Sequence, residues 1–188
     1  MKEYNKPKHV FLLAGLSESG KSYAGKFFDD HGIRRLKYVK LFAHEILQQK
    51  PDINPYQLLD NSTETDEEQA QRATRSLFQI CESENILYCS IESMVKPSTT
   101  IAFKQAIGTN RVSVVYFDIE QEIRLHRQMG RENVDYETAR KIMLPRDEKK
   151  IQFGTPKIKD IADIVIDNSG TIEELNQKLR GLMNEYCI

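Results

Sequence analysis

The sequence contains no tryptophan, only three cysteines and no long apolar run. Cys81, Cys89 and Cys187 are far apart and form no Cys-x-x-Cys pair, which argues against a disulfide framework or a zinc site. We expect them to be small buried side chains in a reducing compartment. Residues 1–8 are polar, and the strongest apolar run, 10–14, has the length of a strand. We therefore expect no signal peptide and no transmembrane helix, and a cytoplasmic location.

A charge excess is also missing, because 27 basic residues are balanced by 28 acidic ones. This balance gives no overall attraction to nucleic acid or to an anionic membrane, and we expect neither as a partner. A chain of 188 residues, 39% hydrophobic and 29% charged, is typical of one globular domain with a real core.

Apolar periodicity predicts five strands that alternate with helices. The predicted strands are 9–14, 36–39, 86–91, 112–118 and 164–166. The predicted helices are 20–30, 42–49, 65–83, 99–107, 120–129 and 135–143, with a last helix from 171 onward. Residues 51–62 are expected to be irregular. Capping-box patterns begin the helices at Thr65 and Thr171, and Gly130 and Pro145 are expected to end two others.

This alternation predicts parallel strands joined by right-handed crossovers. The expected fold class is α/β, a three-layer sandwich around a five-stranded parallel sheet. Functional loops should then lie at the carboxyl ends of the strands.

One motif carries clear chemistry, Gly15-x-x-x-x-Gly20-Lys21-Ser22, between a predicted strand and a predicted helix. Glycines let the loop turn its N–H groups inward, and the helix N-terminus favours negative charge. Lys21 should reach the β- and γ-phosphates of a nucleotide, and Ser22 should bind Mg²⁺. The alternative is a glycine-rich turn that only joins two elements. Glu18 is unusual there, because a carboxylate repels phosphate unless it turns outward or meets Mg²⁺. The predicted nucleotide-binding residues of this segment are Gly15, Ser17, Ser19, Gly20, Lys21, Ser22 and Tyr23.

An arginine cluster follows further along the chain. Arg124, Arg127 and Arg131 have helical spacing, and Arg140 and Arg146 come after them. Such arginines can stabilise the charge of a phosphoryl group in transfer. The alternative is a solvated helix face paired with neighbouring glutamates. The upstream phosphate loop favours catalytic roles for Arg127, Arg131 and Arg146.

Two further segments make the chain similar to a known group. Residues 146–154, Arg-Asp-Glu-Lys-Lys-Ile-Gln-Phe-Gly, and residues 162–175, which include Asn168-Ser169-Gly170-Thr171, resemble the nucleoside-monophosphate-kinase-like branch of P-loop kinases. The chain looks most like dephospho-CoA kinase and related uncharacterised adenylate-kinase-like proteins. The resemblance spans nearly the whole chain and is weakest between about residues 36 and 107.

The resemblance implies a single kinase-like domain over residues 1–188, which uses ATP and Mg²⁺. It implies an acceptor-side region at about 41–83, a short lid at about 127–150, and an adenine-binding loop of Asn168, Ser169 and Gly170. The alternative role for that loop is a plain strand-to-helix turn.

The sequence departs from this group at two carboxylate positions. Residues 37–42 contain no Asp, although these kinases usually have one after the second strand. Glu92 is the carboxylate near the end of the third strand and is a candidate base or metal-holding residue, or else a surface residue.

Two principal functions follow. The first is an ATP-dependent phosphotransferase for a hydroxyl or phosphate of a small molecule such as dephospho-CoA or a nucleotide, with Lys21, Arg127, Arg131, Arg146 and Glu92 as catalytic candidates. Arg72 and Arg75 could hold an anionic acceptor or simply charge a helix surface. The second is a nucleotide-binding regulator without transfer activity, which could have a protein partner. A GTPase-type switch ranks low because no Asn-Lys-x-Asp motif is present.

Overall fold

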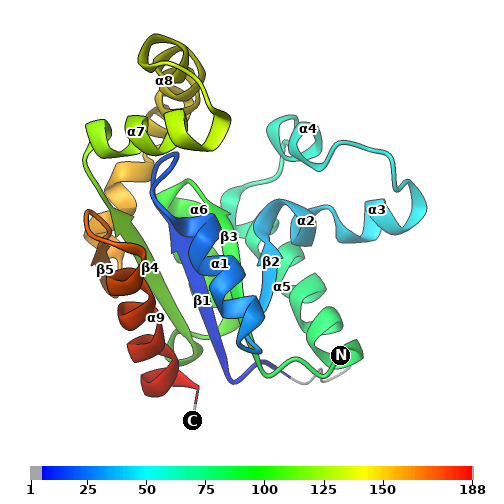
Figure 1. The fold of residues 1–188 in the computed structure, drawn as a ribbon. Coiled ribbons are helices and arrows are strands. Elements are labelled where there is room, and N and C mark those ends of the chain that lie inside the picture. Colours follow the sequence, from blue (N-terminus) through cyan, green and yellow to red (C-terminus); the bar gives the residue numbers. More distant parts are fainter. Residues whose placement is uncertain (1–5, 188) are drawn as a thin grey trace.

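A computed structural model describes residues 6–187 of the chain, which form an α/β sandwich (Figure 1). Its five strands are all parallel and lie in the order β2-β3-β1-β4-β5. The strands are β1 (His9–Ala14), β2 (Arg34–Lys37), β3 (Tyr88–Met94), β4 (Val112–Asp118) and β5 (Ile164–Asp167). The predicted fold class and strand number are confirmed.

The α-helices alternate with these strands as right-handed crossovers require. They are α1 (Lys21–Asp30), α2 (Tyr38–Phe42), α3 (His44–Gln49), α4 (Pro55–Asp60), α5 (Asp66–Ser83), α6 (Pro97–Ile107), α7 (Gln121–Glu132), α8 (Tyr136–Gln152) and α9 (Ile172–Tyr186). Two 3₁₀ helices, η1 (Thr109–Arg111) and η2 (Thr155–Ile161), connect them. Among residues 6–187, no helix combines the length and the apolar character that a membrane span requires.

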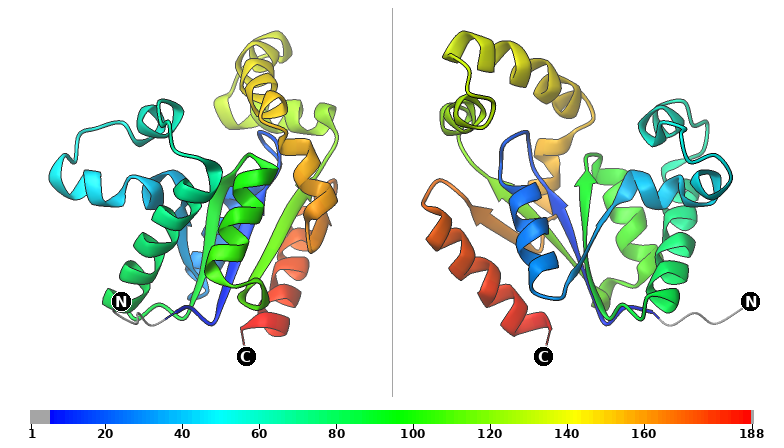
Figure 2. Two further views of the ribbon diagram at one scale, coloured as in Figure 1. Left: turned by 180° about the vertical axis from the view of Figure 1, so that it is seen from behind. Right: turned by 45° about the vertical axis from the view of Figure 1, so that its right-hand side comes forward.

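Strand β1 is the centre of the molecule because both of its faces are buried. Val10 and Leu12 pack in a cluster with α5 and α6 residues such as Leu77. Phe11 and Leu13 pack in a second cluster on the other face, which includes side chains of α1 and α9. The two views of Figure 2 show these helices on opposite faces of the sheet. A strand buried on both faces is expected to be continuously apolar, as 10–14 is.

Two helical units rise from the carboxyl edge of the sheet, at opposite sides of β1 (Figure 1). One is the pair α7 and α8, which have a small core of their own around Leu125, Ala139 and Met143. The other contains α3 and α4 and stands beside β2 and β3. The loop that follows β1 therefore lies between them.

Several predicted boundaries are wrong. Helix α7 passes Gly130 and ends at Glu132, where the left-handed backbone of the capping residue Asn133 (φ 53°) closes it. Helix α8 continues through Pro145 to Gln152. The second strand ends at Lys37, and the following residues form α2, while the predicted helix 42–49 is broken at Ala43.

The segment 51–62 is not irregular throughout, because it contains α4. Asn54 caps this helix by accepting a hydrogen bond from the N–H of Tyr56, and Pro55 occupies its first position. The third strand also begins and ends later than predicted, at Tyr88 and Met94. By contrast, both capping boxes, at Thr65 and Thr171, are confirmed.

Candidate nucleotide-binding site

The loop between β1 and α1 has the backbone that the motif requires. Gly20 precedes α1 with φ of 100°, a left-handed conformation that side chains other than glycine rarely adopt. A Cβ at Gly20 would also collide with the side-chain amide of Asn168. That amide donates a hydrogen bond of 2.9 Å to the carbonyl oxygen of Ser19. The loop after β5 is thus fastened to the phosphate loop.

Two lysines meet at this loop. Lys21 Nζ donates to the Leu16 carbonyl oxygen at 2.5 Å and to Ser19 Oγ at 3.1 Å. Lys150, from α8, donates to Ser17 Oγ at 2.8 Å. Burial and the neighbouring Lys150 ammonium lower the pKa of Lys21 to about 7. Burial likewise lowers the pKa of Lys150. Two crowded ammonium groups of lowered pKa indicate a place prepared for a multiply charged anion.

A buried ion pair fixes α7 and α8 against the phosphate loop. Asp147 and Arg124, each 3% exposed, form this pair. Asp147 also accepts a hydrogen bond of 2.8 Å from the Ser17 N–H, and Arg124 donates to the Ser17 carbonyl oxygen at 3.1 Å. Arg124 is therefore a positioning residue inside the structure, while the other arginines of its helix lie nearer to the cavity.

Arg127 and Arg131 line the cavity beside the loop. Arg127 donates to the Asn168 carbonyl oxygen at 2.8 Å, and burial lowers its pKa. Arg131 forms an ion pair of 2.5 Å with Glu18. Glu18 thus turns toward an arginine of α7, and its positive φ of 58° permits this. Arg131 also contacts Glu132 at 2.9 Å, as the solvated-face interpretation expects of this helix.

Glu92 is buried, only 4% exposed, and the surface interpretation is wrong. Ser22 Oγ donates to its Oε2 at 3.3 Å, and Arg35, from β2, pairs with its Oε1. Gly25 of α1 makes this arrangement fit, because a Cβ there would collide with the Glu92 carboxylate. Arg35 is the second residue of β2, and residues 37–42 beyond it contain no aspartate.

The Ser22 hydroxyl and the Glu92 carboxylate form an oxygen donor pair of the kind that Mg²⁺ prefers. Within residues 6–187 there is no group of three or more His, Cys, Asp or Glu side chains that could hold a metal on its own. This sparse protein contribution fits Mg²⁺, which usually keeps several waters and phosphate oxygens as ligands.

A cavity of about 610 Å³ extends from the phosphate loop toward the start of α9. Tyr23, Asn168 and Gly170 contribute to its wall, together with the apolar side chains of Ile172 and Leu175. An apolar wall next to a phosphate loop suits a base and ribose. Ser169 is exposed and does not line the cavity.

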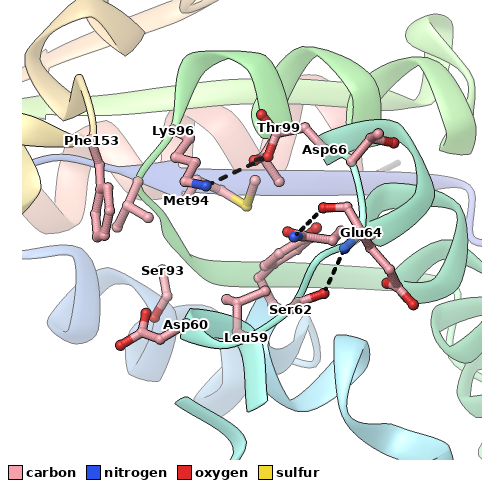
Figure 3. Close-up of a pocket in the computed structure, with 14 residues that line it drawn as sticks. Leu59, Asp60, Ser62, Glu64, Asp66, Ser93, Met94, Lys96, Thr99 and Phe153 are labelled. Atoms are coloured by element: carbon pink, nitrogen blue, oxygen red, sulfur yellow. Dashed lines mark hydrogen bonds and ion pairs between the residues drawn. The ribbon is translucent and has the colours of Figure 1, made fainter. Parts of the chain in front are cut away.

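A second cavity, of about 360 Å³, lies between the end of β3 and residues 59–69. Figure 3 shows its wall, which includes Ser93 and Met94 from β3, Asp66 from α5 and Phe153 from the end of α8. Ser93 directly follows Glu92 and has φ of 74°, a strained value of the kind that clusters at functional sites. Arg72 does not line this cavity; it is paired with Glu64.

The structure brings most of the predicted site residues together around the loop and the first cavity. Arg146 is exposed, and its positive charge reaches Lys150, whose pKa it helps to lower. Sequence reasoning missed Lys150 and Asp147, although both lie in the 146–154 segment that carries the resemblance. It also missed Arg35 and Gly25, for which the sequence offers no motif.

Comparison with known proteins agrees with this fold. No protein-family model matches the chain. A UPF0200 protein of Pyrococcus horikoshii is 24% identical over 180 residues, which cover 94% of this chain and 96% of the relative. The structure of shikimate kinase from Acinetobacter baumannii has a TM-score of 0.54 at 18% identity, covering 95% of this chain and 94% of that one. A gluconokinase from Sinorhizobium meliloti 1021 has a TM-score of 0.54 at 13% identity, covering 97% and 95%. The chain is thus similar in fold to P-loop small-molecule kinases.

Proposed function

We propose that the protein transfers the γ-phosphoryl group of ATP to a hydroxyl group of a small molecule. The observation that carries the proposal is the convergence of four cations on one phosphate loop. These are Lys21, Lys150, Arg127 and Arg131. The kinase names of the structural neighbours support the same reaction class.

Each of these residues has a separable role. Lys21 and the loop N–H groups would hold the β- and γ-phosphates, and Lys150 would approach from α8. Arg127 and Arg131 would neutralise charge on the equatorial oxygens, with Arg146 as a further lid cation. Catalysis would then consist mainly of positioning and electrostatic stabilisation.

Mg²⁺ would be held by Ser22, with Glu92 within reach of the same ion. When bound, it would neutralise part of the phosphate charge. Arg35 engages one carboxylate oxygen of Glu92 and the Ser22 hydroxyl contacts the other, which favours a metal-holding role for Glu92 over that of a base.

The proposed reaction conserves atoms and charge. The acceptor oxygen forms a bond to the γ-phosphorus, and the bond from that phosphorus to the bridging oxygen breaks. ADP leaves with the electron pair, and the hydroxyl proton is released to solvent. The acceptor would enter from the second cavity, between a proposed acceptor-side region of residues 41–83 and a proposed lid of residues 127–150.

The test is ADP formation by the purified protein with Mg²⁺-ATP and a panel of acceptors. The resemblance places dephospho-CoA and the nucleoside monophosphates in the panel, and the structural neighbours add shikimate and gluconate. Acceptor-dependent ADP formation that is lost in Lys21→Ala, but kept in Lys26→Ala on the exposed side of α1, would support the proposal. A protein that does not bind ATP would refute it.

A second candidate is a nucleotide-binding regulator of kinase fold, which would act through a protein partner. The Arg35–Glu92 ion pair favours it, because the carboxylate is already engaged by a cation of β2. ATP binding that depends on Lys21, with no turnover for any acceptor, would support this alternative.

A further inference from the structure

The second cavity contains two buried polar atoms without a hydrogen-bond partner among the described residues. Tyr38 is 3% exposed, its ring packs against Phe103, and its hydroxyl has no partner. Oε2 of Glu64 is also buried and unpartnered, while Arg72 engages Oε1. Both residues line the cavity. Because buried polar atoms are normally satisfied, these two are positioned to bind a ligand that brings hydroxyl groups.

Acidic groups dominate the polar part of this wall. Asp60, Glu64 and Asp66 line the cavity, whereas Lys96 is the one cation among the described lining residues. The Lys96 Nζ atom lies 3.8 Å from Oδ1 of Asp66. Burial, and then the charges of Asp66 and Glu64, raise the pKa of Tyr38, so its hydroxyl stays protonated and lies in a negative environment.

Two cations near the wall are also engaged. Arg72 pairs with Glu64, and Lys149 of α8 pairs with Asp60 at 2.9 Å. An acceptor that carried a phosphate or carboxylate into this cavity would therefore meet carboxylates before it met a free cation. Such an anion would lose its hydration without gaining a compensating partner.

The remaining wall suits the body of a polyhydroxylated molecule. Phe153, Met94 and Leu59 offer an apolar surface, and Figure 3 shows Phe153 facing Ser93 and Asp60 across the cavity. Carboxylate oxygens accept hydrogen bonds from hydroxyl groups, and C–H faces of such molecules pack on aromatic rings.

We propose that this cavity binds the phosphoryl acceptor, and that the acceptor is an uncharged polyhydroxylated molecule such as a polyol, sugar or nucleoside. This inference rests on the proposed function. It assigns Tyr38 and Glu64 as acceptor-binding residues, and it disfavours nucleoside monophosphates, dephospho-CoA and acidic polyols.

The experiment uses charge-matched pairs of acceptors with Mg²⁺-ATP, and it measures ADP formation and ATP binding on the same samples. The pairs are glucitol and gluconate, ribose and ribose 5-phosphate, inositol and inositol phosphate, and each nucleoside with its monophosphate. We expect the neutral member of an active pair to have at least a tenfold higher kcat/KM.

Turnover that favours the anionic members would overturn the inference while upholding the proposed phosphotransfer. ATP binding without turnover for any neutral member would overturn the inference too, and absence of ATP binding would remove the proposed function itself. The three failures are thus distinguishable.

Two variants test the assigned residues. Tyr38→Phe removes an unpartnered hydroxyl, so we expect an unchanged or higher Tm and an unchanged KM for ATP, with about a tenfold higher KM for the acceptor. Tyr56→Phe, an exposed tyrosine of α4 that does not line the cavity, is the matched control. An unchanged acceptor KM in Tyr38→Phe would refute its role.

Glu64→Gln keeps the side-chain shape, removes a negative charge and releases Arg72. We expect the preference for neutral over anionic acceptors to fall about tenfold. A preference that does not change would show that Glu64 does not set the charge of the acceptor.

Discussion

Binding of ATP should draw a proton onto Lys21. Without nucleotide, burial and the Lys150 ammonium lower the Lys21 pKa to about 7, so at pH 8 most molecules carry a neutral amine there. Triphosphate oxygens beside Nζ favour the ammonium form and should raise this pKa well above 8. With a starting pKa of about 7, roughly 0.5 to 1 proton should be taken up per ATP bound at pH 8.

The assay is isothermal titration calorimetry at pH 8 in buffers of different ionisation enthalpy, where the slope of the measured enthalpy gives the proton count. MgATP does not titrate near this pH, so the uptake belongs to the protein. Lys21→Met should remove about one proton from the count and weaken binding. In Lys150→Met, Lys21 should still take up a proton when ATP binds, but the measured number of protons should be smaller. The substitution removes the Lys150 charge, which is the second cause of the lowered Lys21 pKa.

Lys26→Met, on the exposed side of α1, is the control and should change neither quantity. The same linkage has a definite sign for stability. A lysine whose folded pKa lies below its unfolded value binds fewer protons when folded, so the free energy of unfolding of the nucleotide-free protein should rise between about pH 7 and pH 10.5. Proton uptake near zero at pH 8 would refute the lowered pKa and the reasoning built on it.

Three other substitutions give further expectations. Glu18→Gln removes a negative charge from the phosphate loop and should tighten ATP binding about tenfold in titration calorimetry; weaker binding would contradict this. Gly25→Ala should cost about 1–3 kcal/mol of unfolding free energy in urea, because its methyl group collides with Glu92; an unchanged midpoint would show that the helix moves freely. Asp147→Asn leaves Arg124 buried without its partner and should cost about 3–5 kcal/mol, seen as a lower Tm; a Tm equal to that of the wild type would argue against a structural role for the pair.

Features encoded by neighbouring residues could be predicted from the sequence. The phosphate loop, the continuously apolar strand β1 and the two capping boxes all depend on side chains within a few positions of one another. The alternation of five strands with helices also limits the possible strand orders of the sheet, because the crossovers that join parallel strands are right-handed.

Helix ends near Gly130 and Pro145 could not be predicted so well, because they depend on the environment. Pro145 and Lys141 are both exposed, so solvent can hydrogen-bond the carbonyl that the proline leaves unpaired, and α8 continues. Nothing lies within 4 Å of where a Gly130 side chain would be, so this glycine has no packing role, and α7 runs on to Glu132. A breaker residue ends a helix only when the surroundings offer no compensation.

The candidate site divides in the same way. Lys21 and Ser22 belong to a contiguous motif, whereas Glu92, Arg35 and Gly25 come from three different elements and meet only in the folded chain. Sequence spacing could mark Glu92 as a carboxylate near a strand end, but could not show that it is buried and paired.

The Arg35–Glu92 ion pair bears on both proposals, the phosphotransfer and the uncharged acceptor. Arg35 neutralises a carboxylate that lies one residue before Ser93, at the edge of the second cavity. In a kinase for an anionic acceptor, a cation of β2 at this place would be expected to be free to hold that acceptor. Here the cation is already engaged, as are Arg72 and Lys149 around the same cavity. Arg72 and Lys149 thus balance carboxylates of the protein itself, while Lys21 and Lys150 lie at the phosphate loop. This division fits a protein that binds one highly charged substrate, the nucleotide, beside one that carries no charge.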